Sequence, residues 1–335
     1  MKSFWDNLPK PFFAMAPMKD VTDAAFRALI AKRGAPDVFW TEFVSADGLY
    51  HTREIKKMKD EENPLMRDLQ FREDQRPIVA QIFSNKPEMI AYATRLVAEL
   101  GFDGVDLNMG CPDRTIEKQG AGAAMIKNPE LAVEIIHAAK EASSLPVSVK
   151  TRIGYNKESL DEWLPVLLRA GPAAITLHLR TRKEMSLVPA DWELMKKAVE
   201  IRNKINPSVL LIGNGDVQNL EDARARVSES GCDGVMLGRA MFGNPWVFEG
   251  ISGHRMSSSE VGHPMSTHGL DEKLEALVEL AYSFEKISPP KNFSILKKHI
   301  KAFVTGFPGA AELRAKLMSA NSAADLERAI KTKTA

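Results

Sequence analysis

Residues 104–112, with the sequence Gly-Val-Asp-Leu-Asn-Met-Gly-Cys-Pro, place an amide and a thiol at the end of an apolar run. Val105 and Leu107 indicate a buried strand, and the turn that follows puts Asn108 and Cys111 just beyond its carboxyl end. Ligands bind at this end of the strands in parallel α/β proteins. A thiol with a pKa near the reference value of ~8.5 is mostly protonated at neutral pH, so Cys111 can donate a proton or act as a nucleophile. A free cysteine is also often only a small buried hydrophobic residue, and both interpretations stay open.

Lys150 and His178 also end apolar strands of the predicted sheet. A lysine is costly to bury unless it meets an anion or an electron-rich ring, and a histidine in this position can serve chemistry. A solvated lysine and a core histidine bonded to the backbone are the alternatives. The residues at the predicted strand ends form one candidate constellation: Pro17, Met18, Glu42, Gln81, Asn108, Cys111, Lys150, Arg152, His178, Arg180, Asn214, Gly215, Asp216, Gly238 and Arg239.

Two glycine turns, Gly213-Asn-Gly215 and Gly238-Arg239, end the last two predicted strands. Backbone amides at such turns, with the start of a following helix, form the recurrent phosphate cradle of β/α barrels. The ligand should therefore carry a phosphate, although the glycines alone could merely permit tight turns. A dinucleotide fingerprint is absent at Gly120 and Gly122, because its third glycine is replaced by Met125 and no strand precedes it. No cluster has zinc-ligand spacing, so we expect no metal.

These residues need a scaffold of alternating strands and helices. Strands that are apolar on both faces and are separated by helices indicate a parallel sheet covered on both sides. Eight such repeats fit a (β/α)8 TIM barrel better than an open doubly wound sheet. The eight predicted strands are Phe12–Ala16, Val38–Glu42, Ile78–Phe83, Gly104–Asn108, Val147–Thr151, Ala174–His178, Val209–Asn214 and Gly234–Gly238.

Helix signals lie between the strands. Thr22 is expected to cap the first helix, and Asn128 followed by Pro129 is typical of a helix start. A weak helical signal at Ser45–Tyr50 precedes a charged surface excursion over 51–76. The other predicted helices of this region are Thr22–Arg33, Pro87–Leu100, Pro129–Ala142, Ser159–Arg169, Trp192–Lys204 and Leu220–Ser230.

The pattern changes after the eighth strand. We expect a barrel over residues 1–250, a linker over 251–269 that is rich in Gly, Ser and His, and a small α-helical domain over 270–335. Its predicted helices are Asp271–Lys286, Phe293–Thr305, Ala310–Ser319 and Ala323–Lys331.

The second of these helices carries a basic outer face. Lys297, Lys298 and Lys301 lie outside an inner face of Leu296, Ile300 and Phe303. Lysines grouped in this way suit a phosphate backbone, and a merely solvated face is the alternative. Three further basic residues, Lys291, Arg314 and Lys316, belong to the same group. Glu312 is the one acidic residue in the stretch 291–316 that holds all six.

The length and composition limit the class of protein. A chain of 335 residues suggests one large domain and a smaller one, and 44% hydrophobic with 27% charged residues is ordinary for a soluble globular protein. No apolar run approaches the ~20 residues of a membrane helix and no signal peptide is apparent, so we expect a cytoplasmic protein without membrane association. Two cysteines are too few for a disulfide scaffold, and we assign the second, Cys232, to packing.

Together these motifs resemble the tRNA-dihydrouridine synthases, from about Phe12 to Phe248 and in order, and the helical tail fits as well. The resemblance implies an FMN-binding barrel, a helical domain that grips tRNA, and reduction of selected uridines to 5,6-dihydrouridine with NADPH as electron donor. The segments that carry it are Ala16-Pro-Met18, Thr41-Glu-Phe43, Asp106-Leu-Asn-Met-Gly-Cys-Pro112, Val149-Lys-Thr-Arg152, His178-Leu-Arg-Thr181, Gly213-Asn-Gly-Asp216 and Gly231-Cys-Asp-Gly-Val-Met-Leu-Gly-Arg239.

The resemblance also implies roles for single residues. Cys111 would be the general acid, and Lys150 would lie near the flavin ring. Asn108 and Arg152 would face the flipped uracil, with Arg180 and the three lysines as further substrate contacts. The residues that would hold FMN are Pro17, Met18, Gln81, Lys150, His178, Asn214, Gly215, Asp216, Gly238 and Arg239.

One departure from the family pattern is visible after the strand-six histidine. The family usually has glycine where this chain has Leu179, and the usual glutamine is replaced around Glu184-Met185. Two other functions remain as alternatives. One is an FMN-barrel dehydrogenase of a free pyrimidine, against which the lysine-rich tail argues. The other is an RNA-binding barrel without catalysis, against which Cys111, Lys150 and His178 argue.

Overall fold

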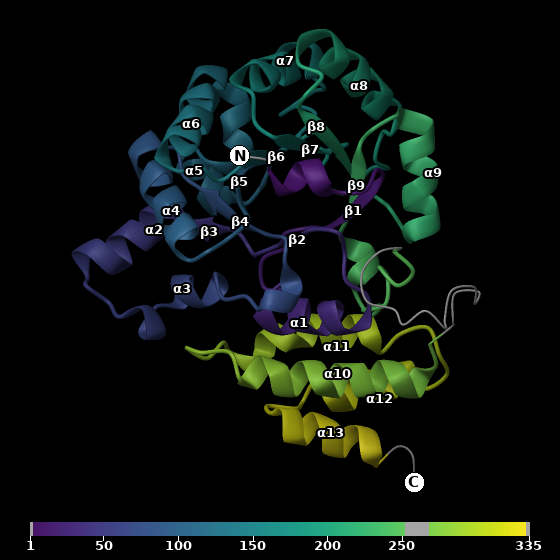
Figure 1. The fold of residues 1–335 in the computed structure, drawn as a ribbon. Helices are drawn as coiled ribbons and strands as arrows, with labels where there is room; N and C mark the ends of the chain where they lie inside the picture. The colour runs from purple at the N-terminus through teal and green to yellow at the C-terminus, as the bar shows by residue number, and fades with distance from the viewer. Residues whose placement is uncertain (1–2, 252–267, 333–335) are drawn as a thin grey trace.

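A computed structural model describes residues 3–251 and 268–332 of the chain. Within these residues, parallel strands form a nine-stranded sheet in the order β1-β9-β8-β7-β6-β5-β4-β2, with β3 paired to β4. A bridge between Ala14 and Val38 joins the two edges, so the sheet closes into a (β/α)8 barrel, as predicted (Figure 1). The strands are β1 (Phe12–Met15), β2 (Phe39–Trp40), β3 (Val44–Ser45), β4 (Ile78–Phe83), β5 (Gly104–Met109), β6 (Val147–Arg152), β7 (Ala174–His178), β8 (Leu210–Asn214) and β9 (Gly234–Leu237).

Helices surround the barrel on its outer side (Figure 1). Their buried apolar faces pack on the strands in one large core, and a second, smaller cluster of strand residues that includes Phe12, Trp40 and Ile212 is separate from it. The predicted start of α6 is confirmed, because the Asn128 side chain accepts the Leu131 amide. The helices of the barrel are α1 (Ala24–Arg33), α2 (Ala46–Tyr50), α3 (Pro64–Asp68), α4 (Pro87–Glu99), α5 (Arg114–Lys118), α6 (Pro129–Ala142), α7 (Leu160–Ala170), α8 (Glu193–Ile205) and α9 (Leu220–Ser230).

Two details of the N-terminal third differ from the prediction. The predicted strand over 38–42 is only two residues long, and β3 is a separate pair. Here the Thr41 hydroxyl accepts the backbone amide of Gln81 and donates to the Glu42 carbonyl. In a continuous strand these bonds would join backbone groups of the two strands, so the Thr41 side chain replaces part of the ladder. The first helix is capped by Asp23, which accepts the Phe26 amide, and not by Thr22. The Thr22 hydroxyl instead accepts the Met18 amide at the barrel mouth.

In the described part of the chain, four α-helices follow the barrel and pack against it through α1. Figure 1 shows α10 and α11 beside α1, with α13 farthest from the barrel. The predicted linker falls almost entirely outside the described residues, which resume at His268. These elements are α10 (Leu270–Glu285), a 3-10 turn η7 (Phe293–Leu296), α11 (Lys297–Phe303), α12 (Ala310–Leu317) and α13 (Ala323–Lys331).

A buried ionic cluster joins these helices to the barrel. The Nζ of Lys291 lies 2.5 Å from Glu42, 3.4 Å from Asp68 and 3.9 Å from Asp23, with the lysine side chain only 2% exposed. Glu42 also accepts the amide of Asp20. Two expectations are therefore wrong: Glu42 does not face the barrel mouth, and Lys291 does not belong to the exposed basic group. In both cases tertiary contact with a distant charge draws the side chain inward.

No helix within residues 3–251 and 268–332 is both long enough and apolar enough to span a bilayer.

Candidate functional site

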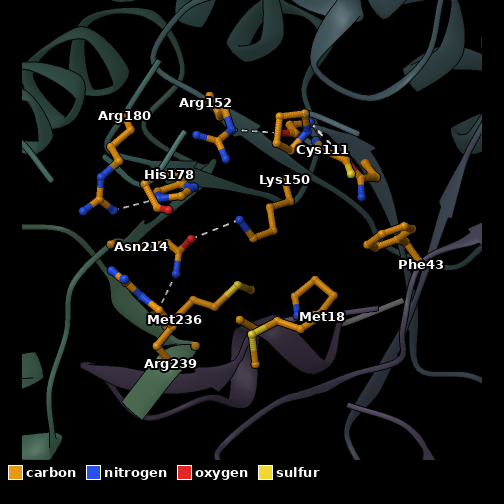
Figure 2. Close-up of a pocket in the computed structure, with 18 of the residues that line it drawn as sticks. Met18, Phe43, Cys111, Lys150, Arg152, His178, Arg180, Asn214, Met236 and Arg239 are labelled. Atoms are coloured by element: carbon orange, nitrogen blue, oxygen red, sulfur yellow. Dashed lines mark hydrogen bonds between the residues drawn. The ribbon is translucent and has the colours of Figure 1, made fainter. Parts of the chain in front are cut away.

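A pocket of about 300 Å³ opens at the carboxyl ends of the barrel strands (Figure 2). Apart from Glu42, all the barrel residues of the candidate constellation line it, so the strand-end positions converge on one cavity. Its wall combines cationic and amide groups on one side with Met18 and Phe43 on another (Figure 2). The lining residues are Ala16, Pro17, Met18, Phe43, Gln81, Asn108, Gly110, Cys111, Pro112, Lys150, Arg152, His178, Arg180, Ser186, Asn214, Gly215, Asp216, Val217, Met236, Gly238 and Arg239.

A chain of hydrogen bonds fixes the turn that carries the thiol. Asp106, fully buried in β5, accepts the Gln81 side-chain amide at 2.6 Å. This bond turns Gln81 Oε1 towards Asn108, whose Nδ2 donates to it at 3.0 Å. Asn108 Oδ1 then accepts the backbone amides of Gly110 at 3.2 Å and Cys111 at 2.9 Å. Because a carboxylate only accepts, Asp106 sets the donor and acceptor direction of the whole chain.

Cys111 is half-buried on this turn. Burial raises the pKa of its thiol above the ordinary value, so Sγ holds its proton at neutral pH. The segment after α5 supports the turn from the other side, since Ala123 donates to the Cys111 carbonyl at 2.9 Å. Gly122 has φ +61° there, and a Cβ would lie 2.7 Å from the same carbonyl oxygen, so only glycine fits. Gly122 is therefore needed for this close approach of two backbone segments, and not for a dinucleotide-binding motif.

Lys150 reaches from β6 towards the last two strands. Its Nζ lies 3.1 Å from Asn214 Oδ1, and Asn214 Nδ2 donates to the Met236 carbonyl at 2.8 Å (Figure 2). Asn214 is thus held with its oxygen towards the lysine. Burial, followed by the charge of Arg152, lowers the pKa of Lys150 to about 8. A lysine whose charge is opposed by its surroundings suits a site completed by an anionic or electron-rich ligand.

His178 at the end of β7 is a neutral imidazole. Burial and then the neighbouring charge of Lys150 lower its pKa well below the usual value. Its Nε2 lies 3.2 Å from Nη1 of Arg180. A guanidinium can only donate, so Nε2 accepts and the ring proton sits on Nδ1.

Asp216 organises the cationic side of the pocket. Its carboxylate bonds to the guanidinium groups of Arg180 and Arg239 and accepts the Ala190 amide at 2.8 Å. The predicted cofactor residue Asp216 therefore orients cations, a role that suits a carboxylate better than direct contact with a phosphate would. Gly215 beside it has φ +139°, and a Cβ there would lie 2.6 Å from Ala190.

Arg152 is used mainly as a scaffold. Its Nε donates to the Gly110 carbonyl at 2.8 Å, and its Nη1 donates to the carbonyls of Thr181 and Met185 at 3.1 Å each. Arg152 therefore connects the Cys111 turn to the loop after β7. It also lines the pocket, where the sequence analysis predicted that it would contact the substrate.

The three predicted substrate lysines of α11 do not line the pocket. Lys298 and Lys301 are exposed and Lys297 is half-buried, in agreement with the predicted inner face of buried Leu296, Ile300 and Phe303. Lys298 lies 3.5 Å from Asp20, two residues beyond Met18 of the pocket. At least this lysine of the basic face thus lies close to the barrel mouth.

Sequence reasoning gave no role to Phe43, Ser186 and Met236, which also line the pocket. Phe43 lies in one of the resemblance segments, and Met236 is an inward position of β9 that strand alternation could have indicated. Ser186 lies in the irregular loop after β7, for which the sequence offers no periodic signal.

Cys232 is buried at the opposite end of β9, where its Sγ lies 3.3 Å from the Gly234 carbonyl, so its assignment to packing is confirmed. Among the residues that the structure describes, no group of three or more His, Cys, Asp or Glu side chains could hold a metal ion.

Comparison with known proteins links this site to one family. A sequence model described as dihydrouridine synthase matches residues 14–335. The chain is 39% identical over 325 residues to a probable tRNA-dihydrouridine synthase of Staphylococcus aureus strain COL, covering 97% of this chain and 93% of that protein. It is 40% identical over 322 residues to probable tRNA-dihydrouridine synthase 2 of Bacillus subtilis strain 168, covering 96% and 93%.

Solved structures share the fold at low identity. A 2-naphthoyl-CoA reductase in complex with 2-naphthoyl-CoA aligns with a TM-score of 0.52 and 10% identity over 70% of this chain and 49% of that one. Histamine dehydrogenase from Rhizobium sp. 4-9 aligns with a TM-score of 0.52 and 13% identity over 85% and 50%. The chain spans about half the length of these two enzymes, and the likeness concerns the barrel architecture alone.

Proposed function

This chain belongs to the dihydrouridine synthase family, and from this premise we propose that its barrel pocket binds FMN and a uridine of tRNA and reduces that uridine to 5,6-dihydrouridine. The observation that carries the proposal is a protonated thiol, Cys111, held by a directed hydrogen-bond chain beside a pocket that is cationic on one side and apolar on the other.

The pocket residues fit FMN on three counts. Lys150, Arg152, Arg180 and Arg239 bring positive charge to the lining, where the carboxylate of Asp216 is occupied by two arginines. The turns after β8 and β9 bring backbone amide groups close to the guanidinium of Arg239, and this combination suits a phosphate group. Met18, Phe43 and Met236 provide apolar surface for a flat ring system.

Lys150 supports the same assignment. Its lowered pKa reflects burial without a matching anion among the pocket side chains, and the electron-rich edge of a flavin would supply the missing favourable contact. The residues that would hold FMN are Pro17, Met18, Gln81, Lys150, His178, Asn214, Gly215, Gly238 and Arg239, with Asp216 orienting Arg239.

Reduced FMN would supply the hydride that adds to carbon 6 of the uracil. The chain's own part is to deliver the second hydrogen as a proton. Cys111 holds that proton on Sγ at neutral pH, and the bonds from Asn108 and Ala123 fix the backbone that carries the thiol. Protonation at carbon 5 leaves a thiolate, to which Arg152 adds a favourable nearby positive charge.

Asn108 is also placed to recognise the base. Its Oδ1 already accepts two amides, and one Nδ2 hydrogen goes to Gln81, so the second Nδ2 hydrogen is the group left for a ligand. Asn108 would therefore donate to a uracil carbonyl oxygen, and a contact at O4 would discriminate uracil from cytosine, which carries an amino group there.

A uridine inside folded RNA must leave its stack to reach this pocket. Lys297, Lys298 and Lys301 of α11, near the barrel mouth, would hold the phosphate backbone around it. We further propose NADPH as the electron donor, binding transiently at the same mouth, and a cytoplasmic location, where NADPH and tRNA occur together.

The test is an anaerobic half-reaction. The purified protein is reconstituted with FMN, reduced with NADPH or NADH in parallel, freed of nucleotide and mixed with unmodified tRNA transcript or with a free pyrimidine such as orotate. Flavin reoxidation by tRNA, with dihydrouridine found in the product, is the expected outcome. Reoxidation by the free pyrimidine alone, or a protein that does not bind FMN, would refute the proposal.

A further inference from the structure

The loop between β7 and α8 presents apolar side chains at the rim of the pocket. Leu187 is 85% exposed, and Met185 and Val188 are 39% and 41% exposed. Single exposed apolar residues are common, but here three occur within four positions on one loop. Ser186, between them, lines the pocket, so the apolar tip of the loop adjoins the pocket in sequence and lies at its rim.

This loop is held firmly in place by two arginines that are themselves buried. Nη1 of Arg152 donates to the Met185 carbonyl at 3.1 Å, and Nε of Arg180 donates to the Val188 carbonyl at 2.6 Å. Arg152 ends β6 and Arg180 lies two residues beyond the end of β7, with only 6% and 3% of the residues exposed. Leu187 is therefore carried by a segment anchored on each side to the pocket wall.

Bonds within the loop add to this order. The Glu184 carboxylate accepts the Thr181 amide at 2.7 Å, and the Glu184 carbonyl accepts the Leu187 amide at 2.9 Å. Met185 adopts φ +56°, a left-handed conformation that is unfavourable for a residue with a long side chain. A conformation of this kind persists only where surrounding contacts impose it, and such conformations gather at ligand-binding sites.

We propose that Leu187 is a base-contact residue that packs against the face of an RNA nucleobase exposed when the target uridine leaves its stack. The inference rests on the proposed function, because it needs RNA at the barrel mouth. Removing one base from a stack uncovers the faces of its neighbours, and an apolar side chain can cover such a face as intercalating residues do in DNA. The exposed Lys183 on the same loop adds a positive charge that suits the adjoining phosphates.

The expected occupant is thus one unpaired or newly unstacked nucleobase of the tRNA, with contact supplied by apolar area and not by hydrogen bonds. Such contacts tolerate different bases, because every base has a flat face. Leu187 would therefore contribute to affinity and to presentation of the uridine and would leave the FMN site untouched.

The experiment compares Leu187→Ser and Leu187→Met with the wild-type protein. Ile55→Ser is the matched control, since Ile55 is 60% exposed and lies beyond β3, across the barrel from β7 in the strand order. Flavin content and the rate of flavin reduction by NADPH are measured first. Single-turnover reoxidation of the chemically reduced flavin by unmodified tRNA follows over a range of tRNA concentrations.

For Leu187→Ser we expect a decrease of about 10-fold in the ratio of maximal reoxidation rate to half-saturating tRNA, because the apolar surface of the leucine is removed. Leu187→Met and Ile55→Ser should stay near wild type, and flavin content and NADPH reduction should not change.

Equal tRNA kinetics for Leu187→Ser and wild type, or an equal loss for Ile55→Ser, would overturn this inference. If reduced wild-type protein itself fails to react with tRNA, the proposed function falls instead, so the two failures are distinguishable.

Discussion

Asn108 Oδ1 accepts the backbone N–H of Cys111 at 2.9 Å, so the residue proposed to contact the uracil also fixes the residue proposed to protonate it. The bond belongs to the chain that begins at the buried carboxylate of Asp106 and passes through Gln81. Substrate recognition and proton delivery are thereby held in one geometry.

Replacing Asp106 with Asn should disturb this chain without changing its volume. An amide can donate as well as accept, so Gln81 and Asn108 lose their imposed orientation and the Cys111 turn loses a fixed acceptor. We expect a decrease of roughly 10-fold or more in single-turnover reduction of tRNA, measured as flavin reoxidation, because a buried bond to a charged group is worth about 1.5–3 kcal/mol. Ser148→Ala is the control, since Ser148 donates to the other Asp106 oxygen at 2.6 Å and does not contact Gln81. A larger loss for Ser148→Ala than for Asp106→Asn would contradict this role.

Replacing Cys111 with Ala should leave FMN binding intact and lower tRNA reduction by roughly 10²–10⁴-fold, the range of general acid catalysis. The pH dependence should identify the thiol. Because burial raises the Cys111 pKa, the wild-type rate should stay constant through neutral pH and decrease only as pH rises through that raised value and the proton is lost. Cys111→Ser, whose hydroxyl does not ionise in this range, should lack the alkaline decrease. The same decrease in the serine variant would assign it to another group.

Replacing Lys150 with Met should weaken FMN binding by roughly 10-fold and remove a pH effect. The Lys150 pKa is about 8 without ligand, and a flavin that favours the protonated amine raises it on binding. Binding then takes up a proton above that pH, so wild-type affinity should decrease as pH rises beyond about 8. Quenching of flavin fluorescence during titration measures both effects. Lys204→Met, at an exposed position of α8, should behave as wild type, and an unchanged pH dependence in Lys150→Met would exclude this lysine as its source.

Replacing Lys297, Lys298 and Lys301 together with Gln should weaken tRNA binding and reduce its salt dependence. Removal of one lysine–phosphate interaction should lower the slope of log K against log salt by roughly 0.7–0.9. Nitrocellulose filter binding at several salt concentrations measures the slope. A charge-matched control replaces Lys196, Lys197 and Lys204 of α8, on the outer wall of the barrel. If both triple variants change the slope equally, the effect is one of net charge and not of a binding face.

Replacing Lys291 with Met should destabilise the junction between the barrel and the helices after it. Burial lowers the Lys291 pKa, but Glu42, Asp23 and Asp68 outweigh that effect and raise it, so the amine is charged. Without it, the buried Glu42 carboxylate loses its ion-pair partner and Asp23 and Asp68 lose a neighbouring positive charge, and we expect a loss of about 3–5 kcal/mol in the free energy of unfolding. Chemical denaturation measures the loss, with Lys286→Met at an exposed position as control. Equal stability of the two variants would show that the cluster is not stabilising.

Most of the barrel and of its pocket could be predicted because each depends on local pattern. An apolar strand followed by polar or glycine residues shows which residues lie at the barrel mouth, and this can be recognised without knowing how the strands pack. Cys111, Lys150, His178 and Arg239 all lie there. Glu42 failed the same rule because its partner, Lys291, lies 249 residues away in the chain and no local signal announces it. The loop containing Ser186 and Leu187 has no periodicity, so its place at the rim could not be derived.

The sequence by itself determined the fold class, the family and the chemical types gathered at the barrel mouth, because periodicity and motif spacing encode which end of each strand a residue occupies. Only the tertiary structure decided how those groups are oriented. The direction of the Asp106–Gln81–Asn108–Cys111 chain and the anchoring of the Leu187 loop depend on bonds between segments that are distant in sequence. The neutral state of His178 depends on its burial and on the charge of Lys150, which extends from another strand. Whether an amide or imidazole group donates or accepts depends on its hydrogen-bond partner, and the folded barrel determines which partner that is.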